Sequence, residues 1–313
     1  MNSPLHTLIQ TLTDAIAVGS LYALIALGYT LVFGILQFIN FAHGDVFALG
    51  AWLTYAVAMG LARWSPGLSG NPILLAVFVP IAVMCGCAIV GYCIERFAYK
   101  PLRSAPRLNV LITAIGVSLL LENTGQLHWA FGPYPQQVPA ILPDRVLATI
   151  AGVDIHLLDV LVVVIALGLM MAMQALIFHT RLGMAMRAVS YNVSAAALMG
   201  VHVDRIISIT FVFGSALAGA AGFLFSMKYP QLQQTAASVW LLLGMKAFIA
   251  AVVGGIGNVR GALLGGLLIG LVEFCGAQYL SSDYRDVYVF AVLIIVLLVR
   301  PTGLLGSTTV EKA

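Results

Sequence analysis

Nine apolar stretches follow one another along the chain, separated by short polar segments. Each has about 17–25 residues, the length that an α-helix needs to cross a bilayer. The pattern predicts an all-α fold, a polytopic transmembrane helical bundle with about 8–10 membrane segments. Two stretches, 41–62 and 239–256, begin or end in polar or glycine-rich sequence, so each is either a full span or a re-entrant or broken segment. The nine lie at roughly 12–36, 41–62, 73–95, 108–130, 157–178, 206–227, 239–256, 261–280 and 287–303.

Composition supports a membrane protein. Apolar residues make up 61% of the 313 positions and charged residues only 9%, against about 25% charged in a soluble domain. So few charges cannot cover a water-facing surface, which excludes an ordinary soluble enzyme, a secreted disulfide scaffold and a disordered chain. We expect one transmembrane domain over residues 1–313, with membrane lipid as its surroundings.

The positions of lysine and arginine predict the orientation of the chain, because these residues are held on the cytoplasmic side of span ends. The stretches 96–107 and 179–205 are rich in arginine and lysine, whereas 62–71, 129–156 and 281–286 are not. With nine crossings, the amino terminus is expected outside and the carboxyl terminus in the cytoplasm.

Motifs of catalysis are absent from the sequence. It contains no Gly-x-Ser-x-Gly elbow, no His-Glu-x-x-His zinc pair and no phosphate-binding loop, so we expect no catalytic residues, no metal, no cofactor and no ATP hydrolysis by this chain itself. The net charge of +3 includes no dense basic run, and nucleic acid is therefore not an expected partner.

Ionisable residues inside apolar stretches are costly in hydrocarbon and face the protein interior by default. The run NFAHGD at 40–45 opens the second stretch. Asn40 and Asp45 suit a purely structural helix start. Alternatively, His43 and Asp45 line the inner mouth of a transport path or latch a moving helix there, and a proton relay through His43 is a lesser option.

Three further charges lie deep in apolar stretches. Glu122, followed by Asn123, belongs either to an interhelical hydrogen-bond cluster or to the translocation path. Lys246 and Glu273 have opposite charge and lie on neighbouring stretches, so we expect them to form an ion pair inside the bundle. All of these residues are candidates for the path.

The basic stretch 179–205 contains a helix-forming run at 194–199. Asn192 and Ser194 are its candidate caps, and Gly200 is its candidate stop. A short exposed helix between two spans is suited to docking in a partner's groove, although an ordinary connecting loop is equally compatible with the sequence.

Six runs in this order resemble the permeases of branched-chain amino acid ABC importers, in the hydrophobic amino acid uptake group. The likeness extends from about residue 19 to 306 and is greatest to the shorter of the two paired permeases. The runs are GSLYALIALG at 19–28, NFAHGD at 40–45, GMAMRAVSYNVSAAALMGV at 183–201, MKAFIAAVVGGIG at 245–257, GALLGG at 261–266 and RPTGLLG at 300–306.

The resemblance implies a bacterial inner-membrane permease that forms a heterodimer with a second related permease subunit. It also implies two ATP-binding ATPase subunits and an extracytoplasmic substrate-binding protein. The stretch 179–205 then holds the helix that couples ATPase closure to the spans. The coupling residues implied in this way are Arg187, Ser190, Ala195, Ala196, Ala197 and Gly200.

The substrate implied is leucine, isoleucine, valine or a similar amino acid. Two alternatives stay open at this point. Related permeases handle urea or short amides, and a secondary transporter working alone would use Asp45, Glu122 and Lys246 as ion-coupling charges.

Overall fold

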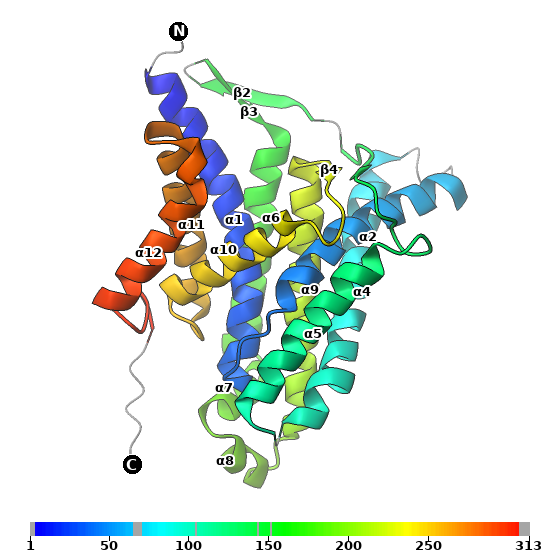
Figure 1. The fold of residues 1–313 in the computed structure, drawn as a ribbon, viewed down its shortest axis with the longest axis vertical. Helices are drawn as coiled ribbons and strands as arrows, with labels where there is room; N and C mark the ends of the chain where they lie inside the picture. Colours follow the sequence, from blue (N-terminus) through cyan, green and yellow to red (C-terminus); the bar gives the residue numbers. More distant parts are fainter. Residues whose placement is uncertain (1–3, 65–70, 104, 143, 151, 307–313) are drawn as a thin grey trace. The chain divides into compact units, whose positions relative to one another are not determined.

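The computed structural model describes residues 4–64, 71–103, 105–142, 144–150 and 152–306 (Figure 1). In these ranges, seven helices are long and apolar enough to cross a membrane. The chain is therefore an all-α polytopic membrane protein. The long helices are α1 (Pro4–Leu36), α2 (His43–Trp64), α4 (Pro72–Cys93), α5 (Arg107–Gly125), α6 (Leu157–His179), α9 (Val203–Lys228) and α11 (Val259–Tyr279).

Two shorter apolar helices complete the set that the sequence predicts, so each of the nine apolar stretches corresponds to a helix. These are α10 (Ser238–Gly254), with 17 residues, and α12 (Arg285–Val299), with 15. Of the two stretches for which a full span and a broken segment were both open, 41–62 gives a helix of full length, α2, whereas 239–256 gives the short α10.

Short elements connect the long helices. A π-helix, η1 (Ile94–Tyr99), and a 3-10 turn, η2 (Lys100–Leu102), continue α4. Helices α7 (Arg181–Tyr191) and α8 (Val193–Leu198) lie between α6 and α9, and a 3-10 turn, η3 (Ser282–Tyr284), precedes α12. Strand β1 (Gln136–Gln137) pairs with β4 (Gln231–Leu232), and β2 (Val146–Ile150) pairs with β3 (Val153–His156), both antiparallel.

Asparagine side chains cap two of the long helices at their first turn, as this side chain does well. Asn71 accepts a hydrogen bond from the Ile73 backbone N–H at 3.0 Å, just before the proline that opens α4. Asn258 accepts from the Arg260 N–H at 3.0 Å and starts α11. These caps satisfy backbone groups that have no partner within the helix.

The chain divides into two compact units. Unit 1 comprises residues 1–30, 145–171 and 245–313, and unit 2 comprises residues 31–144 and 172–244. Because the divisions fall within α1, α6 and α10, each of these helices contributes residues to both units.

Unit 2 is built on the mutual packing of α2, α4 and α9. Gly50 of α2 lies so close to Gly219 of α9 that a Cβ on Gly50 would be 2.8 Å from the Gly219 Cα. Lipid tails are as apolar as the side chains, so the hydrophobic effect does not bring helices together in a bilayer. Close packing of this kind holds them together instead. The rings of Trp52 and Phe131 stack with centroids 5.3 Å apart at one side of this core.

In unit 1, α11 packs tightly against the first part of α1. A Cβ on Gly270 would lie 2.5 Å from the Ala15 carbonyl oxygen and 2.6 Å from the Gly19 Cα. Backbone atoms cannot give way as a flexible side chain can, so this contact requires glycine.

We expect Gly270→Leu to separate α1 from α11 and to lower the stability of the protein by about 1–3 kcal/mol, the usual cost of overpacking. The measurement is the thermal unfolding midpoint in detergent or nanodiscs. Gly116→Leu is the matched control, since a Cβ on Gly116 of α5 meets nothing within 4 Å. Equal midpoints for the two variants would contradict the packing argument.

Candidate functional site

Two of the acidic path candidates come together in unit 2. The Asp45 carboxylate, in the first turn of α2, accepts a hydrogen bond from the Ser118 hydroxyl of α5, and the Glu122 carboxyl interacts with it from the next turn. Ser118 lies about 16 Å along α5 from its first residue, at about 1.5 Å per residue. Asp45 is therefore beside the middle of α5.

A cavity of about 90 Å³ adjoins this pair. Asp45 and Glu122 contribute its acidic groups, and its walls are otherwise mainly apolar. The Thr235 hydroxyl, which also lines the cavity, donates a hydrogen bond to the Glu122 carbonyl oxygen at 2.7 Å. The other lining residues are Ala48, Leu49, Leu121, Thr124, Gly125, Ala130 and Phe131.

The remaining candidates of this region do not line the cavity. Asn40 is buried and accepts a 2.5 Å hydrogen bond from the Tyr99 hydroxyl. His43, the first residue of α2, is also buried. Asn123 is exposed, and its amide donates to the Leu119 carbonyl of its own helix at 2.7 Å. In the described residues, no three His, Cys, Asp or Glu side chains gather as a metal site would require.

Helices α7 and α8 form the segment in which coupling was expected, at one end of unit 2 (Figure 1). Asn192 caps α8 by accepting a hydrogen bond from the Ala195 N–H at 2.8 Å, as predicted. Gly200 follows the helix with a positive φ of 84°, which suits glycine and confirms the predicted stop. Ser194 is not a cap, because α8 already begins at Val193.

The six candidate coupling residues differ in their contacts. The Arg187 guanidinium lies over the Phe178 ring, 5.3 Å from its centroid, and the Ser190 hydroxyl donates to the Gly34 carbonyl oxygen at the end of α1. Ala196 is buried against unit 2 with 4% of its surface exposed. By contrast, Ala195, Ala197 and Gly200 are exposed. The segment is thus attached on one side and open on the other.

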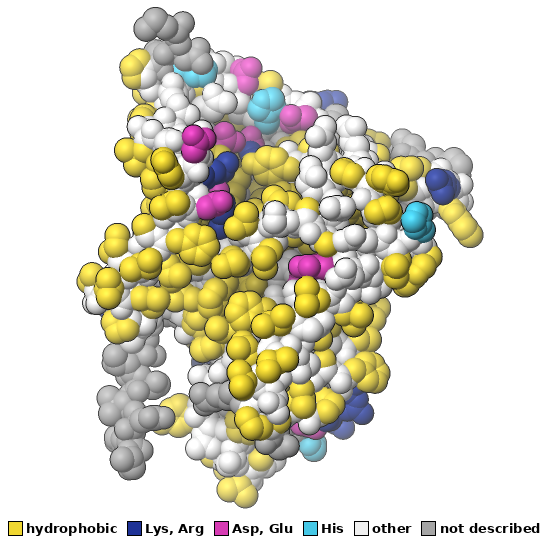
Figure 2. Space-filling view, viewed as in Figure 1, with side chains coloured by type: hydrophobic (Ala, Val, Ile, Leu, Met, Phe, Trp, Pro, Cys, Tyr) yellow, Lys and Arg dark blue, Asp and Glu magenta, His cyan; other side chains and the backbone are white. Residues whose placement is uncertain are grey.

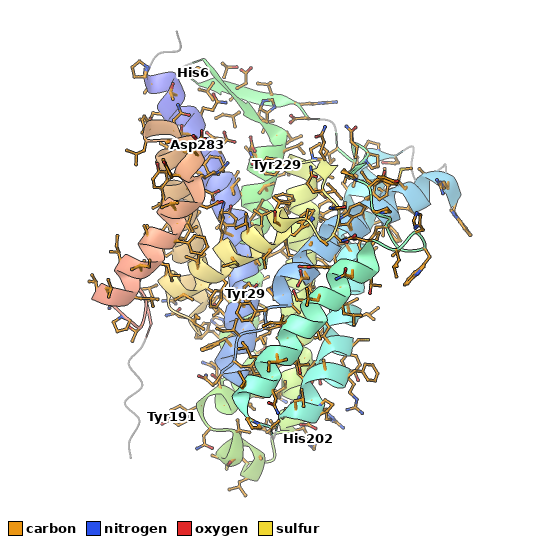
Figure 3. All side chains as sticks on the ribbon, viewed as in Figure 1. His6, Tyr29, Tyr191, His202, Tyr229 and Asp283 are labelled. Atoms are coloured by element: carbon orange, nitrogen blue, oxygen red, sulfur yellow. The ribbon has the colours of Figure 1, made fainter. Side chains whose placement is uncertain are left out.

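The open side of this segment carries large apolar side chains that sequence reasoning did not single out. Leu198 is 89% exposed and Met199 85%. Tyr191, at the end of α7, is 90% exposed, and its ring points away from the helices (Figure 3). We call Tyr191, Leu198 and Met199 the apolar tip. Their residue types are unremarkable in an apolar chain, so only the structure identifies them.

Lys246 and Glu273 form the predicted ion pair, with Lys246 Nζ 2.8 Å from Glu273 Oε1 in unit 1. Two neighbours that we did not predict complete a four-charge network. Asp286 Oδ1 lies 2.6 Å from Lys246 Nζ, and Arg285 Nε lies 2.6 Å from Glu273 Oε1. Figure 2 shows acidic and basic side chains gathered where α11 gives way to α12. The charges of Lys246 and Glu273 therefore neutralise each other within the protein.

A second ion-pair network, in unit 2, involves a buried acid that the sequence did not reveal. Glu95, in the π-helix η1, is completely buried and forms an ion pair with Arg103. The Ser208 hydroxyl of α9 donates to Glu95 Oε2 at 2.6 Å. Arg103 also pairs with Asp204 at 2.5 Å, and Lys100 pairs with Asp204 at 2.7 Å. Asp204 lies in the first turn of α9, so the network joins the residues just after α8 to the end of α4.

The sequence is similar to known transport proteins over nearly its whole length. Residues 11–297 match a family described as "Branched-chain amino acid transport system / permease component". The chain is 40% identical over 307 residues to the high-affinity branched-chain amino acid transport system permease protein BraD of Pseudomonas aeruginosa, covering 97% of each chain.

Two further relatives bear similar names. The permease protein LivH of the high-affinity branched-chain amino acid transport system of Escherichia coli K12 is 38% identical, again over 97% of each chain. A probable branched-chain amino acid transport permease protein LivH of Methanocaldococcus jannaschii is 30% identical over 94% of this chain and 91% of its own length. The chain therefore belongs to the family of permease components of branched-chain amino acid transport systems.

Proposed function

We propose that this chain is the inner-membrane permease subunit of an ATP-driven importer for leucine, isoleucine, valine or similar amino acids. The observation that carries the proposal is the identity of 40% to the permease BraD over 97% of both chains. A chain of this family acts as a transport subunit and not as an enzyme, so the energy must come from other components of the system.

The partners that we propose are a second related permease, two ATPase subunits and an extracytoplasmic binding protein. In this arrangement, residues 1–313 form one permease domain with its amino terminus outside and its carboxyl terminus in the cytoplasm. The exposed apolar tip supports a docking role for the 179–205 loop, since exposed large apolar residues beside a buried one suit a protein contact. The ATPase groove is the proposed occupant.

Coupling would use the two sides of the segment differently. The buried Ala196 and the hydrogen bond from Ser190 to Gly34 attach α7 and α8 to unit 2. The apolar tip would contact the ATPase, whose closure would move the segment as a rigid body. The network around Glu95 would then transmit this motion from the start of α9 to the end of α4. The intramembrane candidates Asn40, His43, Asp45, Glu122 and Asn123 would lie along the path that opens and closes.

Affinity purification of the tagged chain from its native membranes tests the proposal. We expect a second permease and two copies of ATPase subunits to copurify. The purified complex in liposomes, with its binding protein, should take up labelled leucine only when ATP is supplied. Uptake by this chain alone without an ATPase would contradict the proposal, and uptake of urea but not of leucine, isoleucine or valine would overturn the substrate assignment.

A further inference from the structure

The cavity beside Asp45 combines two acidic side chains with mainly apolar walls. Asp45 is only 6% exposed, yet it and Glu122 both line an open space between α2, α5 and the segment around Thr235. Ser118 supplies one hydrogen bond to the Asp45 carboxylate. The cavity therefore has one strongly polar, acidic wall.

Among the described residues that line the cavity, none is a lysine or an arginine. The other buried acids of the described chain, Glu95 and Glu273, each pair with an arginine or lysine, whereas no ion pair reaches Asp45 or Glu122 within the described ranges. Two neighbouring carboxylates repel each other in the low-dielectric interior when both are charged, and a bound cation would offset that cost. Glu95 and Glu273 have basic partners among the described residues, whereas Asp45 and Glu122 do not, and this difference points to a cationic ligand beside Asp45 and Glu122.

The opposite walls suit an aliphatic group. Leu49, Leu121 and Phe131 line the cavity, and Phe131 is held in place by stacking on Trp52. A single water molecule needs about 10–15 Å³, so the volume of about 90 Å³ has room for a group of several heavy atoms. Binding sites for small molecules typically combine such apolar walls with a few converging polar groups.

We propose that this cavity binds the ammonium group of the transported amino acid. Asp45 and Glu122 hold the ammonium group through charge-assisted hydrogen bonds, while Leu49, Leu121 and Phe131 contact the aliphatic side chain. The inference rests on the proposed function, since the substrate class comes from there. It adds that the permease itself, and not only a separate binding protein, recognises the charged end of the substrate.

Direct binding to the permease complex tests this site. The complex is placed in nanodiscs without the binding protein, and saturable binding of labelled L-leucine is measured by equilibrium dialysis. Two competitors dissect the ligand: 3-methylbutylamine keeps the ammonium group but lacks the carboxylate, and 4-methylpentanoate keeps the carboxylate but lacks the ammonium group. We expect the amine to compete with leucine and the acid not to compete.

Substitutions then locate the site. We expect Asp45→Asn and Glu122→Gln, which keep size and shape, to weaken leucine binding about tenfold to a hundredfold each, as loss of a hydrogen bond to a charged group would. Asp283→Asn is the matched control, because Asp283 is an exposed acid of η3 far along the sequence (Figure 3). Gel filtration and basal ATPase activity of each complex show whether the variants remain folded and assembled.

The outcomes separate the two proposals. If the wild-type complex with its binding protein takes up leucine, but leucine shows no saturable binding to the permease, or binds Asp45→Asn as well as wild type, the site is overturned and the proposed function stands. Equal competition by 4-methylpentanoate also overturns it, because the acid carries no ammonium group. If the wild-type complex takes up no leucine at all, the proposed function itself fails.

Discussion

Replacing Leu198 by aspartate is expected to reduce ATP-driven leucine uptake about a hundredfold or more while leaving the protein folded. Leu198 is 89% exposed at the end of α8, so the substitution removes almost no internal contact. In the proposed contact with the ATPase, however, the new carboxylate would be buried without a partner. A penalty of about 3 kcal/mol corresponds to a factor of more than a hundred in binding.

The measurements are uptake into proteoliposomes, copurification of the ATPase and the thermal midpoint of the complex. Leu198→Met is the matched variant, since it keeps an apolar side chain of similar volume, and it should retain most of the uptake. Met199→Asp should behave like Leu198→Asp, because Met199 belongs to the same apolar tip. Wild-type uptake by both aspartate variants would show that the tip does not contact the ATPase.

Replacing Arg103 by methionine should destabilise the protein by about 3–5 kcal/mol, the cost of leaving a buried charge without its partner. Glu95 is completely buried, and Arg103 is its ion-pair partner. After the substitution, the Ser208 hydroxyl remains beside the carboxylate but carries no charge. Thermal or denaturant unfolding of the complex in nanodiscs measures the loss.

The double variant Glu95→Gln with Arg103→Met removes both charges and should recover most of the stability, because no buried carboxylate then remains. Lys100→Met provides a comparison in the same network, since the partner of Lys100 is Asp204, whose side chain is 58% exposed. Its cost should be within about 1 kcal/mol, as for other exposed pairs. Equal losses for Arg103→Met and Lys100→Met would contradict the argument from burial.

Patterns local in the sequence predicted much of the structure. The nine apolar stretches gave nine helices because hydrophobic length alone marks a helix in a bilayer. The Asn192 cap and the Gly200 stop depend on backbone groups a few residues away. The pairing of Lys246 with Glu273 was predictable for a different reason: two opposite charges on adjacent apolar stretches have few other partners.

Features that depend on distant residues could not be predicted. Glu95 is the last residue of the apolar stretch 73–95 and is followed directly by Arg96, so nothing local in the sequence marks it as buried, whereas the fold buries it against Ser208 of α9. Likewise, the contact of Asp45 with Ser118 joins residues 73 positions apart. The apolar tip could not be predicted because its residues differ from other apolar residues in their exposure and not in their type. The small pairings of β1 with β4 and of β2 with β3 also lie in stretches that read as loops.

The π-helix η1 makes the number of residues between Glu95 and Arg103 a structural constraint in its own right. The Lys100 backbone N–H bonds to the Glu95 carbonyl oxygen, five residues back instead of four. Deleting one residue here would restore the α-helical spacing and turn everything after it by about 100°, carrying Arg103 away from both Glu95 and Asp204. Insertions and deletions in this stretch should therefore be tolerated less well than most single substitutions, and chain length is itself part of what the sequence encodes here.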